Sequence, residues 1–399
     1  VKQMIRVGAL IARLFSTAVA AGETPPPNIL LLMAEDMSPR VGAFGDQVAV
    51  TPNLDRLASE GVRFTNVFTA AGVCAPSRAA QITGMHPASI GAQHMRAVNR
   101  PEGGYKAVPP PAVKAYPELL RAVGYFTFTD EKLDYQFSEI RNGTGPTTIW
   151  DSEGANANWS EGDGTRPFFG LINFMQTHES GVFPPLTTRP LSGRYLDFQR
   201  YRAQRFENPD AHDFVAPADV DVPPYYPDDP TVRVAIARHY NNIALMDRQV
   251  GEILDRLERD GLADDTIVIW TTDHGDGLPR AKREVFDSGI KVPMIIRWPE
   301  RYRPAHYDPG QIEGRLVSFV DLAPAILALA GVDAPDYLPG QDFLDALEPE
   351  RQYVFARRDR IDVVQDRQRA VRDRRYKYIR SWHPEKPGGH HIEYSDNMT

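Results

Sequence analysis

The sequence predicts a large mixed, mostly parallel β-sheet sandwiched between helices, and three observations carry this prediction. The run NILLLMA (Asn28 to Ala34) is continuously apolar, as in parallel strands that are buried on both faces. It is followed by TPNLDRLASEG, where Pro52 near the start, an apolar face and the final Gly61 are typical of a helix. Further strands and helices alternate along the chain, which is the pattern of an α/β sheet covered on both faces.

The remaining elements follow the same alternation. Apolar residues at helical spacing predict a long helix from Val232 to Glu258. Short apolar runs predict further strands at Val62 to Phe68, Tyr125 to Thr129, Phe168 to Phe174 and Thr266 to Thr272. Two stretches lack such periodicity, Arg141 to Arg166 and Gly181 to Pro230, and we expect long surface loops there.

Three parts of the chain are expected. Residues 1–24 have a basic start, an apolar run and the small-residue end AVAAG, which is typical of a signal segment and predicts export to the periplasm or the extracellular space. We expect one large domain over residues 25–330 and a smaller α+β domain over residues 331–399. Short strands are predicted in the smaller domain at Tyr353 to Ala356 and Tyr376 to Ile379. No later apolar run reaches membrane-spanning length, so no integral membrane segment is expected.

The composition excludes some classes of partner. The chain has 399 residues, of which 42% are hydrophobic and 25% charged, as is ordinary for globular proteins. Its formal net charge of −8 argues against a partner that is held by bulk positive charge, such as nucleic acid. A local basic pocket could still bind an anionic substrate. Cys74 is the one cysteine, so an intrachain disulfide is impossible, and a lone cysteine is most often a small buried hydrophobic residue.

Two acidic pairs stand where predicted strands end. Glu35-Asp36 follows the first strand, and Asp273-His274 follows the strand that ends at Thr272. Ligands of α/β sheets bind beyond the carboxyl ends of the strands, so the two pairs can converge there. Carboxylate oxygens are the ligands that a hard divalent cation prefers, whereas His274 offers nitrogen and could contact a bound anion instead. The alternative is a pair of solvated turns.

A motif changes the interpretation of Cys74. CAPSRAAQITG (Cys74 to Gly84) matches Cys-x-Pro-Ser-Arg-x-x-x-Ile-x-Gly at every specified position, and on this motif the sequence resembles the type I sulfatase family. The resemblance implies an alkaline-phosphatase-like fold and a maturation enzyme that oxidises Cys74 to formylglycine. It also implies one Ca²⁺ or Mg²⁺ ion. The implied metal ligands are Glu35, Asp36, Cys74, Asp273 and His274. The family has Asp-Asp where this chain has Glu35-Asp36.

The formylglycine has a chemical rationale. A hydrated aldehyde carries two hydroxyl groups on one carbon, so one can attack sulfur while the other later loses its proton and expels sulfate by C–O cleavage. If a helix begins at Pro76, then Arg78 lies in its first turn and can hold the hydrated side chain. The alternative for Arg78 is a solvent-facing helix position.

Further polar residues fit the same resemblance. GYFTFTDEKLDYQF is similar to the family's second motif and places Lys132 as a sulfate-binding cation. Asp134 stands where the family has His, and it could contact a sugar hydroxyl or amino group or merely pair with Lys132. His178 follows a buried strand, as expected for a general acid. Lys282 is the expected second basic residue at the bridging oxygen. A plain surface lysine and a structural histidine are the alternatives for Lys132 and His178.

Short segments favour one branch of the family. AEDMSP, GAQHMR and LDY resemble the branch that includes heparan N-sulfatase, which favours a sulfated carbohydrate, in particular a sulfated amino sugar, over aryl sulfates. His94 and Arg96 are then candidate sugar contacts, with a structured loop as the alternative. A phosphonate or phosphate monoester hydrolase on the same fold and a non-catalytic glycan-binding relative are the rival functions. Because family members normally continue further, we expect the C-terminal domain to be incomplete.

Overall fold

The computed structural model describes residues 25–95, 106–140, 149–184, 193–361 and 364–386, together with residues 389, 392, 394 and 395. The expected leader at residues 1–24 and the candidate Arg96 lie outside the described residues. Among the described residues, every helix is too short or too polar to cross a membrane.

The main sheet has nine strands within the described residues, in the order β4-β3-β5-β1-β6-β7-β2-β8, with β9 also paired to β2. The strands are β1 (Asn28–Ala34), β2 (Val62–Phe68), β3 (Phe126–Thr129), β4 (Ser152–Glu153), β5 (Phe168–Phe174), β6 (Thr266–Thr272), β7 (Lys291–Arg297), β8 (Ile312–Glu313) and β9 (Val317–Ser318). β1 runs parallel to both β5 and β6, whereas β7 is antiparallel to β6 and β2. The predicted mixed, mostly parallel sheet is confirmed.

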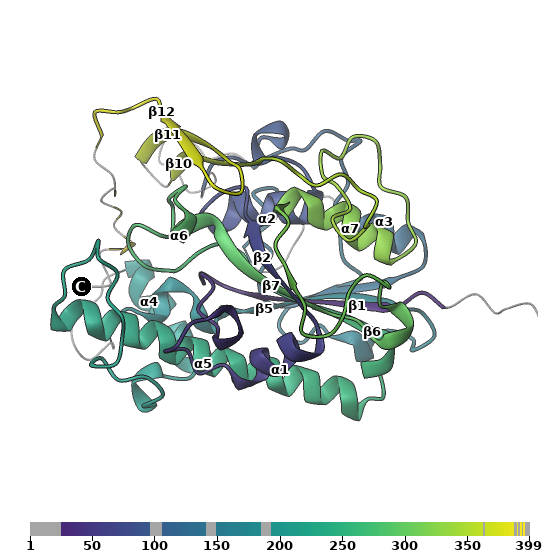
Figure 1. Ribbon diagram of the computed structural model, residues 1–399, viewed down its shortest axis with the longest axis horizontal. Helices are drawn as coiled ribbons and strands as arrows, with labels where there is room; N and C mark the ends of the chain where they lie inside the picture. Colours follow the sequence, from purple (N-terminus) through teal and green to yellow (C-terminus); the bar gives the residue numbers. More distant parts are fainter. Residues whose placement is uncertain are drawn as a thin grey trace, which may run out of the picture.

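Helices cover both faces of this sheet (Figure 1). The helices are α1 (Pro52–Glu60), α2 (Cys74–Thr83), α3 (Tyr116–Ala122), α4 (Gly193–Arg205), α5 (Pro230–Arg259), α6 (Asp287–Ile290) and α7 (Leu322–Leu329). Alternate residues of β1 face opposite layers: Leu31 packs in the cluster with α2, α3 and α7, and Leu32 in the cluster with α1 and α5. This double burial explains why β1 is continuously apolar.

Single turns of 3₁₀ helix connect many of these elements. They are η1 (Gly42–Phe44), η2 (Pro87–Ile90), η3 (Trp159–Glu161), η4 (Met175–Thr177), η5 (Glu179–Gly181), η6 (Pro209–Ala211), η7 (Ala263–Asp265), η8 (Glu300–Tyr302) and η9 (Phe319–Asp321). Two of them, η4 and η5, follow β5 directly and shape the loop that carries His178.

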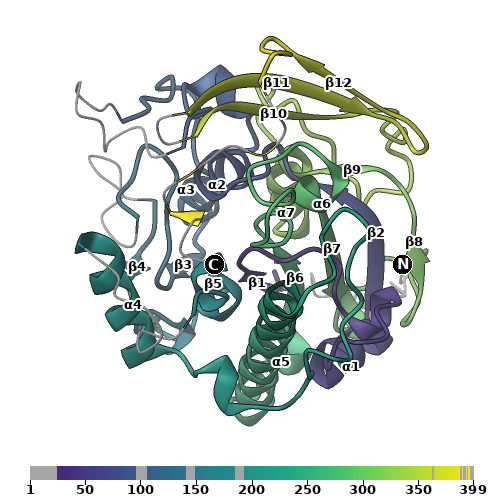
Figure 2. The same cartoon turned by 90° about the vertical axis from the view of Figure 1, so that its left-hand side faces the viewer.

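A second sheet of three antiparallel strands contains β10 (Val354–Ile361), β11 (Val364–Arg372) and β12 (Lys377–Ser381). It lies on the side of α2 that faces away from α5 (Figure 2). Isolated bridges join β10 to both flanks of α2, at Ala71↔Arg357 and Met95↔Ile361. The C-terminal sheet therefore adjoins the segment that carries Cys74. The boundary of the smaller domain at residue 331 stays a prediction.

Two details of the prediction were wrong. The expected loop from Gly181 to Pro230 contains the 13-residue helix α4. The inward face of this helix includes the buried polar residues Gln199 and Arg202, so a search for apolar periodicity finds no signal there. The expected loop from Arg141 to Arg166 likewise contains β4 and η3, although its residues 141–148 lie outside the described part.

Candidate active site

The carboxyl ends of β1 and β6 bring the two acidic pairs together. Ala34 is paired with Thr272 in the parallel register, so both strands end at the same level and their next residues leave side by side. The Asp36 N–H donates to Asp273 Oδ1 at 3.0 Å, and the Asp273 N–H donates to the Ala34 carbonyl at 3.0 Å. The predicted convergence at this edge of the sheet is thus present in the structure.

Asp36 is held by an uncommon backbone conformation and by several donors. Its φ of 47° lies in the left-handed region, which costs a residue other than glycine of the order of 1 kcal/mol. One carboxylate oxygen accepts from the Glu179 N–H at 2.7 Å and from Lys282 Nζ, and the other lies 2.9 Å from His274 Nε2. Burial opposes the charge of Asp36, but the nearby Lys282 ammonium holds its pKa well below the usual range.

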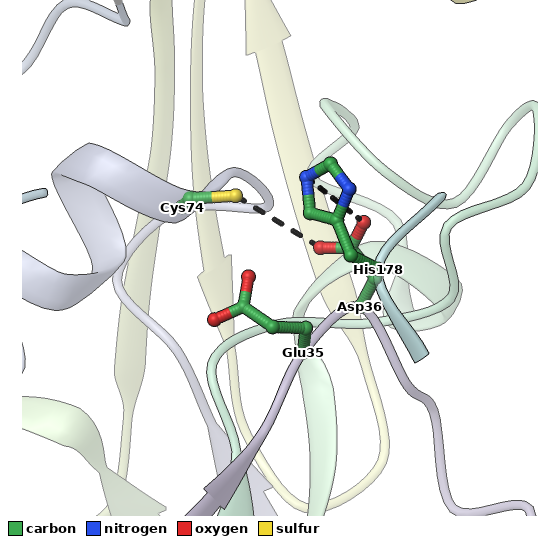
Figure 3. A group of neighbouring side chains, drawn as sticks. All are labelled: Glu35, Asp36, Cys74 and His178. Atoms are coloured by element: carbon green, nitrogen blue, oxygen red, sulfur yellow. Dashed lines mark hydrogen bonds and ion pairs between the residues drawn. The ribbon is translucent and has the colours of Figure 1, made fainter. Parts of the chain in front are cut away.

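Cys74 is the first residue of α2 and is completely buried. Its Sγ lies 3.3 Å from His274 Nε2 and 3.9 Å from Asp36 Oδ1. Figure 3 shows the thiol directed from the start of α2 toward the carboxylate of Asp36, with Glu35 and His178 beside it. The helix begins at Cys74 rather than at Pro76, so the thiol stands where α2 meets the acidic edge of the sheet.

Arg78 lies one turn further along α2, also completely buried. Its guanidinium donates to Glu35, to Asp273 Oδ2 at 3.2 Å and to Asn173 Oδ1 at 2.7 Å. A buried cation is tolerated only when it is paired, and here three acceptors surround it. Burial opposes the charge of Arg78, but Glu35 and Asp273 raise its pKa. The solvent-facing alternative for Arg78 is wrong. A role toward the modified Cys74 side chain stays a prediction.

Lys132 follows β3 and is also buried. Its Nζ contacts one oxygen of Glu35, whose other oxygen is bound by Arg78, and it lies 4.0 Å from Asp134 Oδ2. The plain surface lysine considered for this position is therefore wrong. Burial raises the pKa of Glu35, and Arg78 and Lys132 oppose that effect. Of the contacts considered for Asp134, the one with Lys132 is present, at the outer limit of an ion pair.

His178 and Lys282 approach the same oxygen of Asp36 from two loops. His178 Nε2 lies 3.9 Å from Asp36 Oδ2, and its Nδ1 lies 2.9 Å from Ser180 Oγ. Burial, together with the nearby Lys282, holds the pKa of His178 well below the usual range, so the ring is neutral near pH 7 in this state. Burial opposes the charge of Lys282, but Asp36 raises its pKa, so this residue keeps its proton.

The donor set fits a divalent cation. Ligand atoms of Asp36, Cys74, Asp273 and His274 lie within 4.8 Å of one another, and all four residues are buried. Glu35 and His178 form a second such group with Asp36 and Cys74. Burial lowers the pKa of His274, but Asp273 and Asp36 raise it well above the usual range. The carboxylates therefore favour positive charge at this place in the structure. Their oxygen atoms are also the ligands that a hard divalent cation prefers.

Several residues that the sequence did not single out support this site. Asn173, inside β5, accepts from Arg78 and donates to the Asp130 carbonyl at 2.9 Å. Glu179 binds Asp36 through its N–H, and its carboxylate binds Arg283. A polar residue in the otherwise apolar FFGLINF strand was a usable signal for Asn173. Glu179 was marked only by its place next to His178.

His94, one of the candidate sugar contacts, lies at the border with the C-terminal sheet. His94 Nδ1 accepts from the Arg360 N–H at 3.2 Å, so the end of β10 orients this ring. The neighbouring Met95 N–H donates to the Arg360 carbonyl at 3.0 Å. Met95, Ile361 and Cys74 belong to one buried apolar cluster, which places the segment of His94 beside the start of α2.

The structure combines a mixed α/β sheet, buried acidic residues at the carboxyl edge of that sheet and a helix that begins with CAPSR. Residues 27–332 match the sulfatase family model, and residues 280–387 match the model for the C-terminal part of N-sulphoglucosamine sulphohydrolase. The chain belongs to the sulfatase family.

Two curated relatives show the range of similarity. An ulvan-active sulfatase of Formosa agariphila is 41% identical over 389 residues, which cover 93% of this chain and 63% of the relative. The human N-sulphoglucosamine sulphohydrolase is 28% identical over 395 residues, covering 89% of this chain and 73% of the relative. The chain thus spans slightly less than two thirds of the length of the first of these proteins.

Solved structures share the fold. A 2-O GAG sulfatase superposes with a TM-score of 0.67 at 19% identity, covering 94% of this chain and 86% of that one. The phosphonate monoester hydrolase of Agrobacterium radiobacter superposes with a TM-score of 0.63 at 20% identity, covering 89% and 87%. At these identities the likeness establishes the fold, and this confirms the predicted architecture. It does not distinguish sulfate ester hydrolysis from phosphonate monoester hydrolysis.

Proposed function

We propose that this chain hydrolyses sulfate esters or sulfamates on a sulfated carbohydrate, with a formylglycine derived from Cys74 and one Ca²⁺ or Mg²⁺ ion. The observation that carries the proposal is the position of Cys74. Its thiol lies at the start of α2, within 4 Å of Asp36 and His274, in a buried cluster of positive and negative side chains. The names of the curated relatives, an ulvan-active sulfatase and a sulphohydrolase of N-sulphoglucosamine, support a sulfated carbohydrate as substrate.

The charges of the pocket suit a sulfate group together with a divalent cation. Three buried cations are each paired with a carboxylate: Arg78 and Lys132 with Glu35, and Lys282 with Asp36. Unpaired buried charges are very unfavourable, so an anion alone or a cation alone would disturb this balance. A divalent cation would draw Asp36 and Asp273 toward itself, which leaves Lys282 able to bind sulfate oxygen. Glu35, Asp36, Cys74, Asp273 and His274 are the residues proposed to hold the cation.

A formylglycine formed from Cys74 would supply the nucleophile, because its hydrate carries two hydroxyl groups on one carbon. One of them, once deprotonated, would displace the leaving oxygen or nitrogen from sulfur. Deprotonation of the other would then release sulfate by C–O cleavage and restore the aldehyde. When bound, the cation lowers the pKa of the attacking hydroxyl and balances the charge of the sulfate.

The leaving atom needs a proton, and two residues are placed to supply one. Lys282 carries its proton, because Asp36 raises its pKa. His178 is neutral in the pocket without sulfate, because burial and Lys282 depress its pKa. An anionic sulfate beside the ring would raise that pKa, so His178 becomes a general acid in the presence of substrate. Lys132 binds the sulfate, and Arg78 holds the hydrated side chain of residue 74.

Several finer expectations belong to the same proposal. A formylglycine-generating enzyme would mature Cys74, and the pattern of residues 1–24 supports export. Residues 25–330 would form the catalytic domain and residues 331–399 part of a smaller one. Three candidate contacts for the sugar are His94, Arg96 and Asp134. The match of residues 280–387 to the N-sulphoglucosamine sulphohydrolase model supports a sulfated amino sugar.

A phosphonate or phosphate monoester hydrolase is the second candidate function. The phosphonate monoester hydrolase of Agrobacterium radiobacter has the same fold, so the fold is compatible with this reaction as well. A pocket for a tetrahedral oxyanion does not by itself reject phosphorus. The two substrates differ in charge, because a phosphate monoester carries up to one more negative charge than a sulfate monoester.

The deciding experiment is a substrate panel. The protein is co-expressed with a formylglycine-generating enzyme, conversion of Cys74 is verified by peptide mass spectrometry, and Ca²⁺ is added. We expect sulfate release from sulfated disaccharides, measured by ion chromatography, and loss of that release in Cys74→Ala. Faster release of phosphate from the matched phosphate esters would favour the second function. A fully matured, Ca²⁺-loaded protein that turns over neither would leave only the glycan-binding alternative.

A further inference from the structure

Glu179 and Arg283 form a largely buried ion pair next to Lys282 and Asp36. Arg283 donates from Nη1 to Glu179 Oε2 at 2.8 Å and from Nη2 to Glu179 Oε1 at 2.6 Å, which is a bidentate geometry. Glu179 directly follows His178, and Arg283 directly follows Lys282. The pair therefore joins the two loops that carry the two candidate proton donors. Both members of the pair therefore lie next to residues that are proposed to act on the substrate.

Lys282 has two carboxylates within reach. Its Nζ contacts Asp36, and it lies 3.7 Å from Glu179 Oε1, beyond hydrogen-bond distance. Both oxygens of Glu179 are already bound by the guanidinium of Arg283. A planar guanidinium matches a carboxylate with two parallel hydrogen bonds, whereas an ammonium is a point charge on a flexible stem. Arg283 therefore outcompetes Lys282 for Glu179.

The backbone fixes both members of the pair. Arg283 has φ of 76°, in the left-handed region, and its N–H donates to the Gly72 carbonyl at 2.5 Å. The Lys282 N–H donates to the Asp276 carbonyl at 3.0 Å. On the other loop, the Glu179 N–H is bound by Asp36. A Cβ on Gly277 would lie 2.8 Å from the Cα of Glu179, so the loops are in close contact.

We propose that Glu179 and Arg283 are positioning residues that keep the Lys282 ammonium free for the leaving group. This inference rests on the proposed function. When Asp36 turns toward a divalent cation, Glu179 is the nearest other carboxylate for Lys282 among the described residues. With Arg283 present, that carboxylate is already occupied and Lys282 stays directed into the pocket. Without Arg283, Glu179 captures Lys282 and withdraws it from the substrate.

The test compares variants on two sulfate esters with different leaving groups. Arg283→Ala should lower kcat/KM by about 10²-fold on a sulfated sugar, whose alkoxide needs a proton, and only a few-fold on an activated aryl sulfate. The double variant Glu179→Gln with Arg283→Ala removes the competing carboxylate and should recover at least about tenfold of the loss on the sugar. Arg283→Lys, which cannot form the bidentate pair, should fall between the wild type and Arg283→Ala.

Arg280→Ala is the matched control. Arg280 lies in the same loop, also has a left-handed backbone with φ of 60°, is exposed, and loses the same charge on substitution. It should retain wild-type rates on both substrates. Equal losses on both substrates in Arg283→Ala, with no recovery in the double variant, would mean that the pair only maintains the loop, and the inference would be wrong.

A second readout does not depend on turnover. In a crystal structure of Ca²⁺-loaded Arg283→Ala, Lys282 Nζ should lie within hydrogen-bond distance of a Glu179 oxygen. If Lys282 instead keeps its wild-type position, the capture does not occur and the inference fails. If the matured wild type and Arg280→Ala release no sulfate at all, then the proposed function fails, and the position of Lys282 still decides the inference.

Discussion

Removal of the Arg78 guanidinium should destabilise the protein far more than removal of a surface arginine. In Arg78→Ala, Asp273 Oδ2 and Asn173 Oδ1 lose donors at 3.2 and 2.7 Å, and Glu35 keeps only Lys132. These groups are almost completely buried, so the carboxylates are left with too little positive charge in a region without solvent. Breaking one partner of a buried ion pair costs about 3–5 kcal/mol.

The measurement is thermal unfolding of wild type and variants, followed by circular dichroism in the presence of EDTA. A loss of about 3–5 kcal/mol should lower Tm by about 4–6 °C in a chain of this length. Arg78→Lys keeps one charge but cannot reach three acceptors, so its Tm should fall by less. Added Ca²⁺ should restore part of the loss in both variants, because a bound cation balances the carboxylates and ligand binding stabilises the folded state.

Arg374→Ala is the control for this measurement. Arg374 pairs with Glu350 at the surface, where both side chains are more than half exposed. Such pairs contribute about 0–1 kcal/mol, so its Tm should remain within about 1 °C of that of the wild type. If Arg78→Ala unfolds at the same temperature as Arg374→Ala, then the buried cluster does not depend on the guanidinium and the reasoning is refuted.

Three further predictions address catalysis, metal binding and pH. His178→Ala should lose about 10²- to 10⁴-fold in kcat/KM on a sulfated sugar and far less on an activated aryl sulfate; equal losses on both would make His178 a sulfate ligand only. Asp36→Ala or Asp273→Ala should remove bound Ca²⁺, measured by calorimetry, and a full equivalent of metal in either variant would place the site elsewhere. Asp276 has a lowered pKa: burial opposes its charge, but Arg40 and His239 favour it, and Arg40 Nε lies 2.8 Å away. Its folded pKa lies below its unfolded value, so its charge stabilises the fold above about pH 4 and the contribution is lost as the pH falls through the folded pKa. In urea unfolding, Asp276→Asn should therefore be less stable than wild type by about 1–3 kcal/mol at neutral pH, with a gap that narrows in acid; a gap independent of pH would contradict the assignment.

The sequence predicted the centre of the sheet because its central strands are buried on both faces. β1, β5 and β6 are continuously apolar, and such runs are visible without any knowledge of their neighbours. The convergence of Glu35-Asp36 with Asp273-His274 followed from one topological rule about the carboxyl ends of parallel strands. That rule needed only that β1 and β6 be parallel and adjacent, and they are.

Other parts of the fold and of the site have no such pattern in the sequence. In α4, the buried Arg202 donates from its guanidinium to the carbonyls of Met175 and Gln176 at 3.0 Å. A polar face of this helix therefore contacts the interior, where helices usually present an apolar face. Glu179 and Arg283 are 104 positions apart, and their pairing depends on how two loops approach each other. No spacing rule in one sequence relates residues that meet through loop conformation alone.

Glu35, where this chain departs from the Asp-Asp pair of the family resemblance, has a distinct position in the structure. Its two oxygens are divided between Arg78 of α2 and Lys132 of the loop after β3. Both cations are buried and each requires a counter-charge. A glutamate is one methylene longer than an aspartate, so a single carboxylate at the end of β1 can reach both.

Asp36 and Asp273 have different neighbours from those of Glu35. Asp36 Oδ1 faces Cys74 and His274, and Asp273 Oδ1 lies 3.7 Å from the same His274 nitrogen. Glu35 then balances the charges of Arg78 and Lys132, while the two aspartates lie around His274, which contacts Cys74. It follows that Ca²⁺ affinity should depend more strongly on Asp36 and Asp273 than on Glu35, although the resemblance counts all three as ligands.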